Sequence, residues 1–525
     1  MPGIDRTIVI IGAGAGGLAA AMILAAAGAA VTVVESAPVP GGKMRRVPGP
    51  AGPVEAGPTV LTMLDVFEDL FARAGERLAD WIAATPQPVI ARHFWADGAR
   101  LDLSADPAVS AASIRAFAGP DAERQFLRFR ATAERLHRAF EGPVIRAPRP
   151  AALRAALNAL RAPSLWPWLL PGRPLDAMLR RSFRDPRLAQ LFGRYATYVG
   201  GSPFAAPAVL ALIWRAEEAG VWVPAGGMSG LARAMAAVAE RNGAVFRYGA
   251  EARRILAPAG RVEGVALADG TVLRADDVVF NGDPAALTAG RLGPDAARAV
   301  PPSACRPRSL SAWVWSFTSR PAGPDLDYHN VFFARDPAAE HGPIARGRMP
   351  DDPTLYLCAQ DRAGGRRPAG PERFEIIMNA PATAACAAAV DAREYRSCLL
   401  RTFATLRDRF GLTFDPLPWP PDLTGPRQFA AMFPGSGGAL YGRSPHGTFA
   451  AFRRPPARTA VAGLWLAGGG THPGAGVPMA ALSGLHCAQS ILKARPASTS
   501  MSRRTAMPGG TSTAFPTTEA ARSRS

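Results

Sequence analysis

The segment from Thr7 to Glu35, with the sequence TIVIIGAGAGGLAAAMILAAAGAAVTVVE, constrains the fold more than any other part of this chain. Its pattern predicts a buried strand over Ile8–Ile11, a glycine turn, a helix, and a second strand over Val31–Val34 that ends at an acidic residue. This order is typical of an α/β fold with a parallel sheet. We therefore predict a Rossmann-like domain that begins with these residues.

The turn between the two strands has the form Gly12-x-Gly14-x-x-Gly17. Gly12 permits a tight turn, Gly14 leaves room for a pyrophosphate beside the backbone, and Gly17 lets the helix pack closely on the strand. The helix N-terminus offers free N–H groups and the positive end of the helix dipole. Glu35 closes the second strand and can accept hydrogen bonds from a ribose. The segment therefore predicts a bound dinucleotide.

The same residues have a second interpretation, because residues 7–34 carry no charge and are long enough to span a bilayer. Arg6 before an apolar stretch could also suggest a signal peptide. Four clustered glycines, and a following strand that ends in an acid, are not typical of either. We favour the dinucleotide unit.

The composition excludes a disulfide-rich or zinc-binding protein. The five cysteines are scattered and form no Cys-x-x-Cys pair, so we expect no metal site and a reducing cytoplasm. The net charge of +18 could suit a nucleic acid, but the basic residues are spread along the chain and nearly all are arginine. A generally basic surface is the simplest reading, and a negatively charged membrane surface is the next partner to consider.

Changes in pattern along the chain predict a discontinuous domain organisation. Residues 64–220 have a helical pattern interrupted by prolines, whereas strand and helix patterns return near Val221. We predict a dinucleotide-binding domain from residues 1–65, 221–308 and 456–496. An inserted α+β domain, formed by residues 66–220 and 309–455, would contact substrate and membrane. Residues 497–525 contain few large apolar side chains and are expected to be disordered.

Several short motifs outside the first segment carry a family resemblance. They are Gly41-Gly42-Lys43, the Ala-Gly-Pro-Thr turn at 56–59, Val-Val-Phe-Asn-Gly-Asp-Pro at 278–284, and the glycine-rich stretch Ala467–Pro478. Together they resemble the carotenoid desaturases, a family of FAD enzymes that includes bacterial phytoene desaturases. The likeness extends from about Thr7 to Lys493. Lys43 stands where the family pattern has arginine.

The resemblance implies FAD as the cofactor and indicates the residues that hold it. Lys43 and Arg45 could pair with the pyrophosphate, and a helix that starts near Val477 would turn its positive end toward the flavin. The implied cofactor-binding residues are Gly12, Gly14, Gly17, Glu35, Gly42, Lys43, Thr59, Ala252, Gly468, Gly469, Val477 and Met479.

Three further stretches resemble one subfamily, the 1-hydroxycarotenoid 3,4-desaturases. They are Pro58–Thr62, His93–Gly98 and Phe140–Pro143. This likeness implies FAD-dependent desaturation of an acyclic 1-hydroxycarotenoid, in the synthesis of spheroidene or spirilloxanthin by photosynthetic bacteria. Three alternatives remain open: a phytoene or neurosporene desaturase, an amine oxidase of related architecture, and a non-catalytic isoprenoid-binding escort protein.

Desaturation removes a hydride and a proton from adjacent carbons. Loss of hydride beside a polyene leaves a delocalised cation, so the proton becomes acidic and a strong protein base is not required. No residue is identified as the base. His472 is the best candidate by position, although a structural or cofactor-packing histidine is the more common situation, and Glu141 is a second candidate.

A carotenoid must be collected from a membrane, and residues 146–187 suit that task. This stretch holds nine arginines, two aspartates, and the apolar residues Trp166, Trp168, Leu169 and Leu170. Basic residues beside tryptophan are typical of interfacial anchors. The alternative is an arginine-rich, solvated helix pair whose tryptophans lie in the core. We predict a cytoplasmic protein peripherally associated with the inner or photosynthetic membrane.

A hydroxyl group carried into an apolar tunnel needs a hydrogen-bond partner. Tyr195, Thr197 and Tyr198 could supply it, in a stretch that resembles the family, although a purely packing role is the more common situation for any one tyrosine. The sequence leaves the terminal electron acceptor open.

Overall fold

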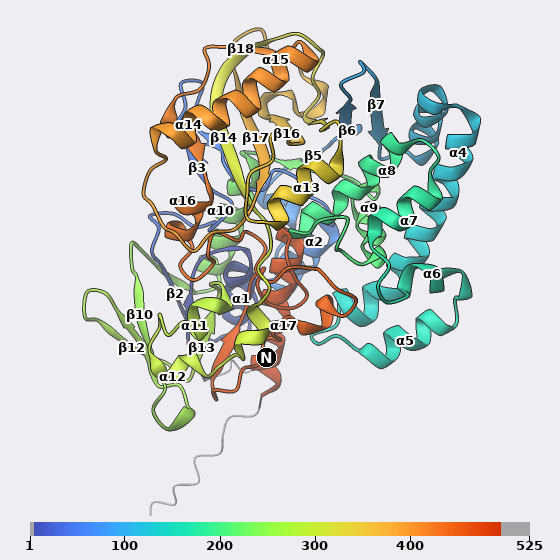
Figure 1. Cartoon of the computed structure of the whole chain (residues 1–525). Coiled ribbons are helices and arrows are strands. Elements are labelled where there is room, and N and C mark those ends of the chain that lie inside the picture. The colour runs from blue at the N-terminus through green and yellow to red at the C-terminus, as the bar shows by residue number, and fades with distance from the viewer. Residues whose placement is uncertain (1–4, 495–525) are drawn as a thin grey trace, which may run out of the picture.

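The computed structural model describes residues 5–494, which form two sheets and a helical lobe (Figure 1). The first sheet has the order β20-β13-β1-β2-β9, and all its pairings are parallel. Ile8, Val9 and Ile10 are all buried, so the sheet is covered on both faces, as the continuous apolar run predicts. Its strands are β1 (Thr7–Ile11), β2 (Ala30–Glu35), β9 (Val245–Tyr248), β13 (Asp277–Phe280) and β20 (Leu464–Leu466).

Three helices pack on one face of this sheet and a small antiparallel sheet packs on the other. The helices are α1 (Ala15–Ala26), α10 (Gly227–Arg241) and α17 (Val477–Lys493). The opposite layer comprises β10 (Ala252–Leu256), β11 (Gly264–Leu267), β12 (Val272–Arg274), α11 (Pro284–Thr288) and α12 (Pro294–Ala297). A Cβ on Gly484 would lie 2.1 Å from the Gly16 carbonyl oxygen, so α1 and α17 cross at backbone contact.

The second sheet has the order β18-β14-β17-β16-β15-β6-β7, with β19 also paired to β14. One face is packed by aromatic side chains under α14 (Ala392–Leu399) and α15 (Thr405–Phe410), at the top of Figure 1. Its strands are β6 (Val89–Phe94), β7 (Arg100–Ser104), β14 (Ser311–Ala322), β15 (His329–Phe332), β16 (Leu355–Ala359), β17 (Glu372–Ala380), β18 (Thr413–Asp415) and β19 (Leu423–Thr424). Two short antiparallel strand pairs are separate from these sheets: β3 (Arg46–Val47) with β4 (Val54–Glu55), and β5 (Ala84–Pro86) with β8 (Trp222–Pro224).

The prediction that residues 64–220 are helical is wrong for β5, β6 and β7. Residues 90–94 are all buried, so β6 lacks the alternation of apolar and polar side chains by which a half-exposed strand is recognised. β6 pairs in parallel with β15, a strand more than 230 residues further along the chain. β6 also pairs antiparallel with the neighbouring strand β7, so a local hairpin and a long-range pairing together hold this segment extended.

The remaining part of residues 64–220 is helical, as predicted, and most of it forms the lobe at the right of Figure 1. Phe126, Phe129, Phe192 and Trp214 fill its core. Its helices are α4 (Pro107–Phe140), α5 (Ala152–Leu160), α6 (Trp166–Leu169), α7 (Leu175–Ser182), α8 (Pro186–Gly193) and α9 (Leu212–Glu218). The other helices are α2 (Leu64–Arg73), α3 (Leu78–Trp81), α13 (Pro337–Ala345) and α16 (Pro426–Met432).

Within residues 5–494, no helix combines the length and the apolar character needed to cross a bilayer. The predicted disordered segment 497–525 lies outside the described residues.

Candidate active site

The glycine turn joins β1 to α1 and is packed so closely that side chains cannot be added at several positions. A Cβ on Gly17 would lie 2.1 Å from the Gly12 carbonyl oxygen, and a Cβ on Gly16 would lie 2.5 Å from the Gly468 nitrogen. Gly12 has a φ of +98°, which favours glycine. Gly14 caps α1 without any side-chain hydrogen bond, so the first N–H groups of the helix remain available to an anion.

Asn281 stabilises this turn, and it was not predicted individually from the sequence. Its Nδ2 donates to the Gly12 carbonyl oxygen at 3.0 Å. A Cβ placed on Gly14 or on Gly468 would come within 3.1 or 2.7 Å of this side chain. Asn281 follows β13 within the motif at 278–284, and that motif was the signal that could have identified it.

Glu35 ends β2 beside the turn and is held by backbone donors. Its Oε2 accepts from the Ala13 nitrogen at 2.7 Å and its Oε1 accepts from the Ala37 nitrogen at 2.9 Å. The Ala250 nitrogen donates to the Glu35 carbonyl oxygen at 2.9 Å, which brings the start of β10, where Ala252 lies, close to the same acid. The acid is thus positioned next to the glycine turn.

Gly42 also borders the turn, because Gly41 pairs with Gly14 and a Cβ on Gly42 would lie 3.1 Å from the Gly14 Cα. The two cations that follow it contact the second sheet and its flanking loops. Lys43 Nζ donates to the Leu440 carbonyl oxygen at 2.5 Å, and Arg45 donates to Thr424 Oγ1 at 2.9 Å. These contacts lend no support to the prediction that Lys43 and Arg45 pair with a pyrophosphate.

Thr59 links the Ala-Gly-Pro-Thr turn to the second sheet. Its hydroxyl lies 2.7 Å from the Tyr356 hydroxyl, which in turn lies 2.5 Å from His329 Nδ1. All three side chains are largely buried, so a polar chain leads from the predicted flavin turn into β16 and β15.

The C-terminal glycine segment completes the first site. Gly468 has a φ of +100° and lies against the Gly12–Gly17 turn through its contact with Gly16. Gly469 follows it, and α17 begins at Val477 with Met479 in its first turn. Gly476 caps α17 without a side-chain hydrogen bond, so this helix also presents free N–H groups.

Neither candidate for the catalytic base is free of other contacts. His472 Nε2 lies 2.8 Å from the Ala147 carbonyl oxygen, its ring stacks on His486, and burial lowers its pKa. Such contacts are typical of a structural histidine. Glu141 accepts from Arg146 at 2.8 Å and also lies near His137, so its carboxylate is already paired.

A row of buried polar residues crosses the second sheet, and the sequence analysis did not predict it. The strand register places His329, Cys358, Glu375 and Ser316 side by side on β15, β16, β17 and β14. We call these four residues the polar row. His329 Nε2, both Glu375 carboxylate oxygens and Ser316 Oγ have no hydrogen-bond partner.

The polar row lies on the face of the second sheet that is opposite to α14 and α15. Val314 and Ile377 share this face and pack against Phe429, Phe433 and Leu440. The same group of residues contacts Lys43 and Arg45, since the ammonium of Lys43 lies over Phe433 and the guanidinium of Arg45 over Phe429. The row therefore faces the segment that follows the glycine turn.

The predicted hydroxyl partners lie in the helical lobe. The Tyr198 hydroxyl donates to Glu217 at 2.6 Å and accepts from Arg194 at 3.2 Å, and Thr197 donates to the Arg194 carbonyl oxygen. The Tyr195 hydroxyl is buried and unpartnered. Tyr198 and Thr197 are thus already engaged.

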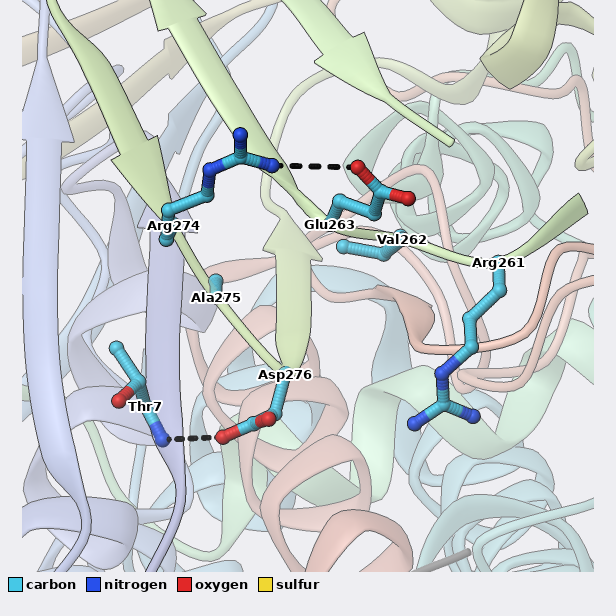
Figure 2. Close-up of a pocket in the computed structure, with 7 residues that line it drawn as sticks. All are labelled: Thr7, Arg261, Val262, Glu263, Arg274, Ala275 and Asp276. Atoms are coloured by element: carbon cyan, nitrogen blue, oxygen red, sulfur yellow. Dashed lines mark hydrogen bonds and ion pairs between the residues drawn. The ribbon is translucent and has the colours of Figure 1, made fainter. Parts of the chain in front are cut away.

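A surface hollow lies at the other end of the first sheet (Figure 2). It is lined by Thr7, Arg261, Glu263, Arg274 and Asp276, and an Arg274–Glu263 ion pair of 3.2 Å closes one side. These residues lie near the amino ends of β1 and β13, whereas ligands of open parallel sheets bind at the carboxyl ends. The hollow is therefore separate from the glycine turn.

The residues around the turn fit a dinucleotide. Four backbone segments meet there in close contact, at Gly12–Gly17, Gly41–Gly42, Asn281 and Gly468. They leave two uncapped helix N-termini, of α1 and α17, and a ribose-type acid at Glu35. FAD would be held by these groups.

Sequence comparisons agree with this geometry. Residues 15–315 match the model of the family described as flavin containing amine oxidoreductase. The chain is 56% identical over 485 residues, 92% of its length and 97% of the relative's, to the hydroxyneurosporene desaturase of Cereibacter sphaeroides. It is 44% identical over 516 residues, 97% and 98% of the two chains, to a protein of the same name from Rubrivivax gelatinosus. A lycopene-forming phytoene desaturase from Paracoccus is 31% identical, over 90% of this chain and 94% of its own.

Solved structures share the fold at low sequence identity. A putrescine oxidase variant superimposes with a TM-score of 0.59 at 14% identity, covering 94% of this chain and 99% of its own. An oxidoreductase from Methanosarcina mazei gives a TM-score of 0.58 at 17% identity, covering 93% and 100%. The chain therefore belongs to the carotenoid desaturase branch of the flavin-containing amine oxidoreductases, and its cofactor is FAD.

Proposed function

We propose that the protein desaturates an acyclic carotenoid bearing a 1-hydroxy group at its 3,4 carbon–carbon bond. The main support for this proposal is the 56% identity, over 92% of the chain, to a relative named hydroxyneurosporene desaturase. Two further relatives with that name match 94% and 97% of the chain. General phytoene desaturases match less strongly, at 28–32% identity.

The cofactor, when bound, can accept a hydride from the substrate. The chain's own task is to hold the two partners in a dry, ordered arrangement. The bare backbone around Gly14 and Gly42 supports a pyrophosphate role for that turn, and Glu35 supports a ribose role. The uncapped start of α17 at Val477 supports the prediction that a positive helix end lies beside the flavin.

The contacts of the two base candidates support proton loss without a dedicated base. His472 is occupied by the Ala147 carbonyl oxygen and Glu141 by Arg146. A cation spread over a polyene makes the neighbouring proton acidic, so a weakly basic group suffices to accept it. The residues that bind FAD and orient the substrate then account for the catalysis.

The predicted division of the chain also remains a proposal. Segments 1–65, 221–308 and 456–496 supply the strands of the first sheet, and 66–220 with 309–455 supply those of the second. A flavin domain with an inserted substrate domain is consistent with that pairing. The intact glycine turn argues against an escort protein that no longer needs the cofactor.

Exposed apolar and basic side chains on α5 and α6 form a surface that supports peripheral association with an anionic bilayer. We call it the membrane-contact surface. Leu153 and Leu160 on α5 are 74% and 63% exposed, and Trp166 on α6 is 48% exposed. Arg154 and Arg161 are exposed beside them. Exposed apolar side chains next to cations suit the headgroup region of a membrane.

The predicted membrane pair of tryptophans needs correction. Trp168 is 8% exposed and its ring lies 6.1 Å from Phe129, so it belongs to the core of the lobe. Leu153 and Leu160 take its place at the surface. The helical spacing of leucines in α5 is the signal from which this could have been predicted.

The test of the function uses FAD-loaded protein in liposomes with 1-hydroxyneurosporene or neurosporene and one shared electron acceptor. We expect the hydroxylated carotenoid to gain one conjugated double bond and to absorb at longer wavelength. A site that pairs with the hydroxyl should discriminate against the carotenoid that lacks it. Equal turnover of both, or efficient conversion of phytoene, would favour the general phytoene desaturase and leave the FAD assignment intact.

A further inference from the structure

Glu375 is the most unusual buried group in the protein. It is 0% exposed, and among the described residues it is the buried carboxyl group for which both oxygens lack a hydrogen-bond partner. A fully buried carboxylate without a partner is costly, so such a group is retained where something else is bound beside it. No residue role described above uses Glu375.

The electrostatic surroundings favour the neutral acid at this position. Burial raises the pKa of Glu375 well above its ordinary value, the charge of Arg45 acts in the opposite direction, and Glu55 adds to the increase. A neutral carboxyl group has one O–H donor and a carbonyl acceptor. It can therefore pair with a hydroxyl group that either donates or accepts.

The partner of a 1-hydroxy group must lie near the reacting bond. Only two or three carbon–carbon bonds of about 1.5 Å separate the hydroxyl-bearing carbon from the 3,4 carbons, so the hydroxyl oxygen lies within about 5 Å of them and its partner one hydrogen bond beyond. Glu375 lies on the sheet face that packs against Phe429, and the guanidinium of Arg45, which follows the Gly41–Gly42 turn, lies over that ring and acts electrostatically on Glu375. Arg45 Nε is itself buried and unpartnered.

The alternative partners in the helical lobe fit this requirement less well. The Tyr198 hydroxyl is already bonded to Glu217 and Arg194. Tyr195 is enclosed by Phe192 and Trp214, with ring centroids 6.4 and 5.7 Å away, inside the aromatic core of the lobe. Neither tyrosine contacts a segment of the first domain in these interactions.

We propose that Glu375, with Arg45 beside it, forms the polar end of the carotenoid site and hydrogen-bonds the hydroxyl group of the substrate. This inference rests on the proposed function and adds the residue that sets the preference for a hydroxylated carotenoid. Glu375 is a specificity-determining residue in this account, and the hydride and proton steps do not pass through it.

The test compares Glu375→Leu and Glu375→Gln with the wild-type protein in the liposome assay. Leucine cannot pair with the hydroxyl, so kcat/KM for 1-hydroxyneurosporene should fall about ten- to a hundred-fold, with little change for neurosporene. Glutamine keeps a donor and an acceptor and should retain most of the preference. The matched control is Thr318→Val, which removes another unpartnered hydroxyl from the same sheet and should leave the preference unchanged.

Flavin content and the unfolding temperature identify any variant that has not folded. Loss of the preference in Glu375→Leu, with its recovery in Glu375→Gln, would support the proposal. A flavin-loaded Glu375→Leu protein that keeps the wild-type preference would overturn it.

An infrared measurement tests Glu375 without turnover. The wild-type protein should show a C=O stretching band of a protonated carboxyl group that is missing in Glu375→Gln. That band should shift when 1-hydroxyneurosporene binds and stay in place with neurosporene. Absence of the shift would overturn the role of Glu375, whereas failure of the wild-type protein to convert any carotenoid would overturn the proposed function.

Discussion

The glycine turn and the polar row are both buried, but they differ in hydrogen bonding. The polar side chains at the turn have partners, whereas several of those in the row have none. At the turn, both oxygens of Glu35 accept backbone hydrogen bonds and the Gly12 carbonyl oxygen accepts from Asn281. In the row, Glu375, His329 and Ser316 all carry buried atoms without partners. At the turn, the protein's own groups thus satisfy these polar atoms, and the N–H groups at the start of α1 remain free to bind an anion.

This difference shows which kind of ligand each region can take. The turn recognises its ligand through shape and backbone N–H groups, which suits a charged pyrophosphate. The row offers side-chain donors and acceptors in an apolar setting, which suits a mostly apolar molecule with a single polar group. A flavin nucleotide and a hydroxylated polyene are ligands of these two kinds.

The largest effect is expected at the turn. In Gly14→Val the Cβ would lie 3.1 Å from Asn281 Nδ2, and the two methyl groups would project where the pyrophosphate must lie. We expect almost complete loss of bound flavin, measured as the ratio of flavin absorbance to protein. Gly370→Val, where an added Cβ meets no atom within 4 Å, is the control and should keep its flavin. Full flavin in Gly14→Val would remove the assigned role of the turn.

A smaller effect is expected on stability when low pH protonates a histidine of the polar row. Burial, followed by the charge of Arg194, lowers the pKa of His329 to about 3 from its ordinary value of 6.5. The unfolded chain then binds the proton more tightly than the folded protein, so stability is present above pH 6.5 and is lost as the pH falls toward 3.

One such histidine contributes about 1.4 kcal/mol per pH unit in that range. Between pH 7 and pH 5, the unfolding free energy of His329→Gln should therefore fall by about 2 kcal/mol less than that of the wild-type protein. Urea denaturation at the two pH values measures this difference. Arg138→Gln, at an exposed position on α4, should leave the slope unchanged. An unaltered slope in His329→Gln would mean that its environment is more polar than the structure indicates.

The smallest effect is expected at the surface of α5 and α6. Leu153→Ala combined with Trp166→Ala should weaken co-sedimentation with anionic liposomes about tenfold, since both side chains are exposed and apolar. Flavin content should not change. Trp419→Ala is the matched control, because Trp419 is also exposed but lies between β18 and β19. Equal binding of the double variant and the control would exclude this surface as the membrane contact.

The sequence predicted the first region far better than the second. Gly12, Gly14, Gly17 and Glu35 lie within one short segment, where local spacing alone specifies a strand, a turn and a helix. The predicted strand and helix are present with nearly the expected bounds, as β1 and α1 show.

The polar row could not be predicted in the same way. Its four residues come from four strands, and His329 and Glu375 become neighbours of Cys358 only through the register of β15, β16 and β17. Each residue alone looks like an isolated polar group in an apolar strand. β6 was missed for a related reason, because nearly all of it is buried and one of its two partners, β15, is distant in sequence.

The contact between α1 and α17 has a consequence for the order of events during synthesis. Gly16 on α1 contacts Gly484 on α17, and Gly468 lies against the glycine turn. Residues near both ends of the described chain therefore form the cofactor site together. A ribosome releases the glycine turn hundreds of residues before the segment that closes over it. The site is therefore complete only after α17 has left the exit tunnel, so its closure is a late step in the assembly of the protein.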